Sequence, residues 1–244
     1  MVKNPQLSNV GNLGDIIKHA ALVELAKLIQ SRNQDEKINY LDTHTYLLES
    51  TCSNGGWRKE TAELLSSYAR YGNYIALESA TVDSGQYLCS SGLALAVLKE
   101  PALFLAEADD DTRKELSSQL AASGIKPQIF FADMKGYSFL QPIEKQGPTL
   151  AIVDPFKLND TQWREIWDDA KNGITAIHKD GSDGIVLVFN YDTEKPATWF
   201  EPPQGFEGPV MSHASGKYHF AAYCTPAIRD SVLNTLDRLG WHLL

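Results

Sequence analysis

The chain has 244 residues, of which 43% are hydrophobic and 22% charged, and this composition is ordinary for a globular protein with one sizeable core. Its net charge of −9 argues against a protein whose whole surface binds nucleic acid, because phosphate contacts need Lys and Arg, although a local basic groove remains compatible with it. There is no apolar run near the roughly 20 residues that span a bilayer and no signal-peptide core at the N-terminus, so we expect a cytoplasmic protein.

The sequence alternates between stretches with helical spacing and short apolar stretches typical of strands. The expected helices lie in Gly14–Ser31, Trp57–Gly72, Gly92–Lys99, Thr112–Ala122, Asp160–Lys171 and Pro226–Leu239. The expected strands lie in Lys37–Thr43, Pro101–Asp111, Lys126–Tyr137, Pro148–Phe156, Asp183–Tyr191 and Lys217–Cys224, the last alternating like an edge or antiparallel strand. This order predicts an α/β fold with a mostly parallel sheet in a single domain, 1–244, in which 47–86 forms a helical insertion.

The cysteines carry little functional information. Cys52, Cys89 and Cys224 lie far apart, and no CxxC pair or Cys/His cluster has the spacing of metal ligands. We therefore expect free, mostly buried thiols and no metal site.

Four expected strands in succession end in an acidic residue: Asp42, Glu107, Asp133 and Asp154. Ligands of doubly wound sheets bind beyond the carboxyl ends of the strands, and a carboxylate there can accept hydrogen bonds from ribose hydroxyls or adenine amines. Asp and Glu also follow strands because they cap the next helix, so each position has a structural interpretation as well. Four in sequence favour a nucleotide-like ligand site.

Several segments, in matching order and spacing, resemble the RlmJ family, bacterial methyltransferases that modify the exocyclic amine of an adenine in large-subunit ribosomal RNA. These segments are Gly11–Leu22 (GNLGDIIKHAAL), Tyr40–His44 (YLDTH), Ser84–Leu98 (SGQYLCSSGLALAVL), Leu105–Asp110 (LAEADD), Ala132–Tyr137 (ADMKGY) and Ala214–Phe220 (ASGKYHF). The Gly-Asn-x-x-Asp-x-x-Lys-His pattern in the first of them is the most specific.

The resemblance implies a class I, Rossmann-like, S-adenosylmethionine-dependent methyltransferase fold with a sheet of about seven strands. It also implies a set of cofactor-binding residues, with Glu107 on the ribose and Asp133 on the adenine of the cofactor. The set comprises Lys18, His19, Asp42, Thr43, His44, Ser90, Ser91, Glu107, Asp133 and Asp154.

The resemblance further implies that Asp154, Pro155 and Phe156 form the catalytic motif, with Lys18 and Lys157 touching an RNA or DNA substrate. An adenine amine is a poor nucleophile because its lone pair is delocalised into the ring. A carboxylate and a nearby backbone carbonyl that accept its hydrogens favour the pyramidal nitrogen, and an aromatic side chain stacks on the flipped base.

Two segments depart from the family pattern. The family's catalytic tetrapeptide is Asp-Pro-Pro-aromatic, whereas this chain has Asp154-Pro155-Phe156-Lys157. After Asp42 the family has small residues and glycines, whereas this chain has Thr43-His44-Thr45-Tyr46-Leu47. The sequence therefore leaves two hypotheses open: a methyltransferase acting on an adenine amine of RNA or DNA, or a catalytically degenerate relative that serves as a binding or interaction module.

Overall fold

The structure, a computed structural model, describes residues 13–51, 71–82, 86–127, 129–131, 147–155, 160–191, 201–215 and 218–243. The predicted helix over 57–72 lies almost entirely outside these ranges.

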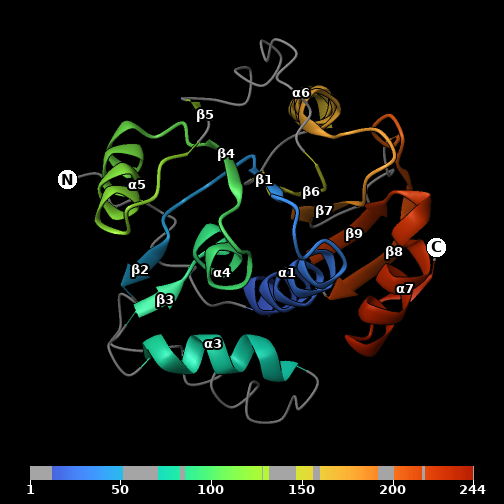
Figure 1. The fold of residues 1–244 in the computed structure, drawn as a ribbon, viewed down its shortest axis with the longest axis horizontal. Coiled ribbons are helices and arrows are strands. Elements are labelled where there is room, and N and C mark those ends of the chain that lie inside the picture. The colour runs from blue at the N-terminus through green and yellow to red at the C-terminus, as the bar shows by residue number, and fades with distance from the viewer. Residues whose placement is uncertain are drawn as a thin grey trace.

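The helices and strands alternate along most of the chain (Figure 1). The helices are α1 (Leu13–Arg32), α3 (Gly72–Val82), α4 (Ser90–Val97), α5 (Asp110–Ala122), α6 (Asp160–Ile177), the 3-10 turn η4 (Pro226–Ile228) and α7 (Arg229–Arg238). The strands are β1 (Asn39–Asp42), β2 (Glu49–Thr51), β3 (Gln86–Leu88), β4 (Ala102–Ala106), β5 (Ile129–Phe131), β6 (Thr149–Val153), β7 (Gly184–Tyr191), β8 (Glu207–Ser215), β9 (Tyr218–Cys224) and β10 (His242–Leu243).

The main sheet has the strand order β10-β8-β9-β7-β6-β1-β4-β5. The strands from β7 to β5 run parallel to one another, and β9 is antiparallel to both of its neighbours, β7 and β8. A central first strand with parallel crossovers to both sides, and one antiparallel strand inserted near an edge, is the class I methyltransferase arrangement. The predicted fold class is therefore confirmed, with the two-residue β10 added at the edge.

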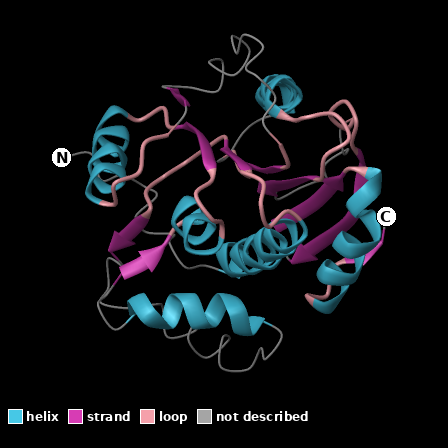
Figure 2. Ribbon diagram, in the orientation of Figure 1, coloured by secondary structure: helices cyan, strands magenta, loops and turns pink. Residues whose placement is uncertain are grey.

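Helices cover both faces of the sheet (Figure 2). Alternate residues of each central strand enter different cores: Leu150 and Ile152 of β6 pack with α1, whereas Ala151 and Val153 pack against α6. Helices α4, α5 and α7 contribute to the same core as α1. Because both faces are covered, the central strands β4 and β6 are almost wholly apolar, which is the pattern that made them recognisable in the sequence.

Two elements differ from expectation, and a third resolves an alternative that the sequence left open. Helix α6 continues to Ile177, beyond the predicted end at Lys171. The sequence pattern did not predict β8, whose run Glu207–Ser215 contains Gly208 and Pro209 and lacks a clear alternation. The strand over 217–224 is expected to be an edge or an antiparallel strand; β9 is antiparallel and not at an edge, since it is paired with both β7 and β8.

The described part of 47–86 contains a strand and a helix. Strand β2 pairs with β3 to form a separate two-stranded antiparallel sheet. Helix α3 packs on α1 on the side away from the main sheet (Figure 1). The description of this segment as a helical insertion within one domain stays a prediction, because 52–70 lie outside the described residues.

Among the described helices, none combines the length and apolar character that crossing a membrane requires.

Candidate functional site

Three of the four predicted acids stand at the ends of adjacent strands, in the order β6-β1-β4. Asp42 ends β1, where it is in register with Ile152 of β6 and Leu105 of β4. Asp154 and Glu107 therefore each lie two positions beyond the end of β1, on either side of it. Neighbouring strands are about 4.8 Å apart, so these two acids flank a space on the order of 10 Å wide.

Asp154 is held by a lysine from the first helix. The Nζ atom of Lys18 lies 2.6 Å from Asp154 Oδ2 and 3.1 Å from Asp15 Oδ1, one turn earlier on α1. Burial by itself lowers the pKa of the Lys18 ammonium, but the carboxylates of Asp154 and Asp15 outweigh this effect and hold the pKa well above its ordinary value. Lys18 therefore stays charged and shares its charge between two carboxylates.

The chain after β1 passes from the end of β6 to the end of β4, and so lies between Asp154 and Glu107. The amide of Thr43 donates to Ile152 O at 3.1 Å, and the amide of Thr45 donates to Ala106 O at 2.8 Å. No residue of this crossing has a positive φ. The absence of glycine from 43–47 is therefore compatible with the backbone path, although the sequence alone marks it only as a departure from the family pattern.

His44 stands in this crossing and is neutral at physiological pH. Its Nδ1 atom lies 2.8 Å from Thr43 Oγ1. Desolvation lowers the pKa of the imidazole to about 4, and the nearby Asp154 carboxylate offsets only part of this. The positive charge beside Asp154 therefore comes from Lys18 and not from His44.

Asp42 directs its oxygens toward donors of the protein itself. Oδ2 accepts from Tyr40 Oη at 3.1 Å and from Ser91 Oγ at 3.0 Å, and Oδ1 accepts from the His44 amide at 3.2 Å. Burial raises the pKa of this carboxyl to about 6, although the three hydrogen bonds oppose the rise. Asp42 thereby ties the end of β1 to the first turn of α4.

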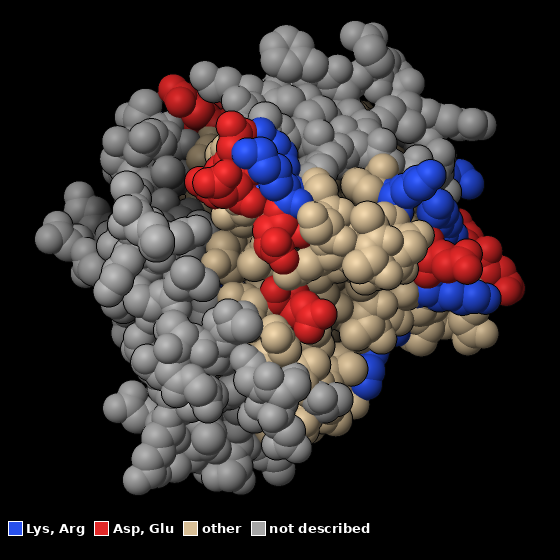
Figure 3. Space-filling model, turned by 90° about the vertical axis from the view of Figure 1, so that its left-hand side faces the viewer, with Lys and Arg blue, Asp and Glu red and all other residues tan. Residues whose placement is uncertain are grey.

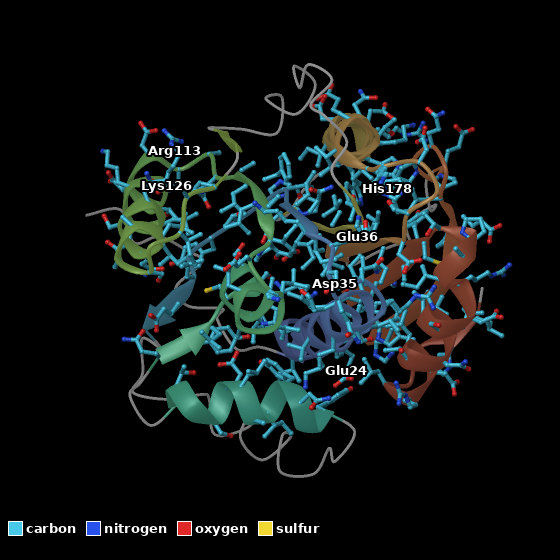
Figure 4. All side chains as sticks on the ribbon, in the orientation of Figure 1. Glu24, Asp35, Glu36, Arg113, Lys126 and His178 are labelled. Carbon is cyan, nitrogen blue, oxygen red and sulfur yellow. The ribbon has the colours of Figure 1, made fainter. Side chains whose placement is uncertain are left out.

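Glu107 is buried except for an 8% exposed fraction, and it retains acceptor capacity. Oε1 accepts from the Asp109 amide at 2.8 Å; within the described part of the chain Oε2 has no hydrogen-bond partner. Burial raises the pKa of this carboxyl to about 7. Arg113, labelled on α5 in Figure 4, donates to the main-chain oxygen of Glu107 at 2.9 Å and so braces the strand end.

The predicted serines lie in the first turn of α4. Ser91 reaches Asp42, as described above, and Ser90 Oγ lies 3.1 Å from His19 Nε2. The other ring nitrogen of His19, Nδ1, lies 2.8 Å from Tyr87 Oη. Helix α4 lies very close to the chain at Leu48: a Cβ atom placed on Gly92 would be only 2.1 Å from Leu48 O. The glycine therefore allows this close packing beside the strand ends.

The tertiary structure brings most of the predicted site residues to one edge of the sheet. These are Lys18, His19, Asp42, Thr43, His44, Ser90, Ser91, Glu107, Asp154 and Pro155. The predicted residues Asp133, Phe156 and Lys157 lie outside the described residues.

Sequence reasoning missed three residues that contact this group. Asp15 shares the charge of Lys18, Tyr40 donates to Asp42, and Tyr87 contacts His19. A signal existed for Asp15, since it lies three residues before Lys18 on an expected helix and belongs to the Gly-Asn-x-x-Asp-x-x-Lys-His pattern. Tyr40 is two residues from Asp42 on the same strand face, whereas nothing local pointed to Tyr87.

The face that carries α5 has mixed charge: its acidic and basic side chains gather together (Figure 3). Arg113 is paired with Asp110, and Lys114 lies 3.3 Å from Asp111. Within the described ranges, no group of three or more His, Cys, Asp or Glu side chains is arranged to hold a metal ion. Cys89 and Cys224 are free and buried, as predicted, and Cys52 lies outside the described residues.

Comparison with solved structures supports the fold. Protein LPL1258 from Legionella pneumophila, assigned to the family DUF519, is 18% identical with a TM-score of 0.59, over 93% of this chain and 92% of that one. An rRNA methylase from Streptococcus thermophilus is 11% identical with a TM-score of 0.40, over 84% and 94%. TrmN from Thermus thermophilus is 16% identical with a TM-score of 0.43, over 89% and 52%.

No protein-family model matches the chain, and no curated protein sequence matches it either. At these identities the structural likeness shows the fold alone. The resemblance to the RlmJ family stays a prediction.

Proposed function

We propose that the protein is an S-adenosylmethionine-dependent methyltransferase that acts on an adenine amine in RNA or DNA. The observation that carries the proposal is the placement of Asp154 and Glu107 two positions beyond Asp42 on either side of β1. In the proposal Glu107 is available to a ribose, and Asp154, on the other side of β1, to a target amine.

The residues at this edge fit the proposed cofactor. Oε2 of Glu107, which has no hydrogen-bond partner among the described residues, can accept from a ribose hydroxyl. Ser90 begins α4, where helix N-terminal amides and hydroxyls favour polar or anionic groups. When bound, the cofactor supplies an electrophilic methyl group. Asp133, the proposed adenine ligand, lies outside the described residues.

Asp154 is suited to accept a hydrogen bond from an amine. Lys18 donates to its Oδ2, while Oδ1 has no hydrogen-bond partner within the described part of the chain. Lys18 also pairs with Asp15, and the formal charges of Asp15, Lys18 and Asp154 add up to −1. In the proposal Oδ1 accepts the amine hydrogen, Pro155 fixes the backbone beside it, and Phe156 and Lys157 contact the base and a phosphate.

The first test is calorimetric titration with S-adenosylmethionine and S-adenosylhomocysteine, with Glu107→Ala for comparison. Wild type is expected to bind both ligands. The variant should lose about 1.5–3 kcal/mol, the usual contribution of a hydrogen bond to a charged group. Absence of binding by wild-type protein would remove the methyltransferase proposal.

The second test measures methyl incorporation from labelled cofactor into ribosomal RNA and single-stranded DNA. Asp154→Asn keeps the shape but replaces an acceptor-only group, so the rate should fall at least roughly tenfold. A gain of activity in Lys157→Tyr would support an enzyme whose stacking residue has diverged.

The second candidate function, a non-catalytic interaction module of the same fold, is favoured by the tetrapeptide Asp154-Pro155-Phe156-Lys157, which departs from the expected pattern. Cofactor binding without incorporation into either nucleic acid by any variant would favour this function.

A further inference from the structure

A chain of buried side chains connects α3 and β3 with the first turn of α4. Tyr74 Oη lies 3.4 Å from Tyr87 Oη, which lies 2.8 Å from His19 Nδ1. On the other side of the ring, His19 Nε2 lies 3.1 Å from Ser90 Oγ. Tyr74, Tyr87 and His19 have exposed fractions of 1%, 2% and 2%. Water therefore does not compete for these bonds.

The segment that carries Tyr87 is anchored independently of this chain of bonds. Strand β3 pairs with β2, and the amide of Leu88 donates to Glu78 Oε2 at 3.1 Å. The amide of Cys89 donates to Leu48 O at 2.9 Å. Only Leu88 and Cys89 separate Tyr87 from Ser90, so the two residues that hydrogen-bond to the imidazole belong to one short, anchored stretch.

The imidazole of His19 is neutral. Burial, with the nearby charge of Lys18 as a second cause, lowers its pKa well below the ordinary value. A neutral imidazole carries one proton, so one ring nitrogen donates and the other accepts. The role of Nδ1 toward Tyr87 therefore determines whether Nε2 donates a hydrogen bond to Ser90 Oγ or accepts one from it.

The lengths of two contacts favour Nδ1 as the accepting nitrogen. An imidazole nitrogen is a better acceptor than a phenol oxygen, and the Tyr87–His19 contact is shorter than the Tyr87–Tyr74 contact by 0.6 Å, the difference between 3.4 and 2.8 Å. With the Tyr87 hydroxyl as the donor to Nδ1, the proton of His19 would sit on Nε2 and be donated to Ser90 Oγ. The Ser90 hydroxyl hydrogen is then left to donate elsewhere.

We propose that Tyr87 is a positioning residue that fixes the His19 tautomer and thereby makes the Ser90 hydroxyl a donor to the bound cofactor. This inference rests on the proposed function for its final step, since the cofactor is the acceptor. The tautomer itself is a property of the protein alone and can be tested without any ligand.

The first experiment is nitrogen NMR on protein with labelled histidine, with the His19 signals identified by their loss in His19→Gln. Wild type should show a protonated Nε2 and an unprotonated, hydrogen-bonded Nδ1. In Tyr87→Phe the two nitrogen shifts should move toward each other as the ring exchanges between tautomers. Tyr223→Phe, which alters a buried tyrosine in the core that contains α6, is the control and should leave the His19 signals unchanged. A protonated Nδ1 in wild type, or an unchanged pattern in Tyr87→Phe, would overturn the proposal.

The second experiment titrates S-adenosylhomocysteine into wild type, Tyr87→Phe, Ser90→Ala and the double variant, at a temperature where thermal unfolding shows all four to be folded. Tyr87→Phe should weaken binding about fivefold, the usual effect of losing one hydrogen bond. The double variant should bind no more weakly than Ser90→Ala, because Tyr87 acts through Ser90. Independent, additive losses would contradict the positioning role.

The two experiments separate the two proposals. If wild type does not bind the ligand, the proposed function fails, and the NMR result still decides whether Tyr87 fixes the tautomer. If wild type binds and Tyr87→Phe binds equally well, the inference fails and the proposed function stands.

Discussion

The ammonium of Lys18 lies 2.6 Å from the carboxylate of Asp154, although 136 residues separate them in the chain. The contact fixes the start of α1 against the carboxyl end of β6. Side-chain exposed fractions of 12% for Lys18 and 29% for Asp154 mean that neither charge is well hydrated. The pair is therefore both a structural contact and the main electrostatic feature of the candidate site.

Lys18→Met should destabilise the protein by about 1–3 kcal/mol, because removal of one partner leaves Asp15 and Asp154 without their shared cation in a poorly hydrated place. The measurement is chemical denaturation of single and double variants. Part of the loss should be recovered in Lys18→Met with Asp154→Asn, which removes the uncompensated charge. Lys114→Met is the control, since Lys114 is 77% exposed and its ion pair contributes little. Equal effects of the Lys18 and Lys114 substitutions would show that the buried pair contributes no more to the free energy of unfolding than an exposed pair does.

Cofactor affinity should rise with pH through about 7 if Glu107 holds the ribose. The pKa of its carboxyl is about 7, and ionisation converts a group that can donate into one that only accepts. Calorimetric titrations with S-adenosylhomocysteine at several pH values between 6 and 8 should therefore show tighter binding at the alkaline end. Glu107→Gln does not ionise, so it should flatten this dependence; persistence of the full dependence in that variant would assign it to another group.

Glu78 should make the protein less stable as the pH rises. Burial raises the pKa of its carboxyl from 4.5 to about 8, so between these values the folded state holds a proton that the unfolded state has released. The stabilising contribution is thus fully present below about 4.5 and is lost as the pH rises to about 8.

Glu78→Gln removes this titration. The free energy of unfolding of the variant, relative to that of wild type, should therefore rise by about 1–3 kcal/mol between pH 5 and pH 8, since a tenfold change in a protonation equilibrium corresponds to about 1.4 kcal/mol. Urea denaturation at the two pH values measures it. Glu115→Gln, on the exposed surface of α5, is the matched control and should show no such growth. A constant difference between Glu78→Gln and wild type would mean that Glu78 is ionised in the folded protein.

Gly92→Ala should destabilise the protein by roughly 1–3 kcal/mol or more, because the new methyl group would meet Leu48 O at 2.1 Å and the backbone must move. Gly72→Ala is the control, since nothing lies within 4 Å of a Cβ atom there. Thermal unfolding of both variants gives the comparison. Since Gly92 lies next to Ser91, cofactor binding should weaken in Gly92→Ala even where the variant is folded; unimpaired stability would show that α4 can shift away from Leu48.

The sequence was sufficient for the class of fold and for the edge of the sheet where the acids gather. Strands β1, β4 and β6 are buried along their length, β4 and β6 are almost wholly apolar, and each strand ends at or just before an acidic residue. Parallel strands place their carboxyl ends at one edge of the sheet. For this reason the sequence alone predicted that Asp42, Glu107 and Asp154 lie close together. Strand β8 was not predicted, because its Gly and Pro residues break the alternation on which strand prediction depends.

Only the tertiary structure decided what these acids contact. No local pattern indicates that Lys18 reaches Asp154 or that Tyr87 reaches His19, because both contacts depend on how α1 packs against β6 and α4. The same packing gives the acids different partners: Asp42 accepts from internal donors, Asp154 pairs with a lysine, and Glu107 has an oxygen without a hydrogen-bond partner among the described residues. Residue type and spacing determined where charge collects, whereas burial and partners, which arise only on folding, determined what each charge can do.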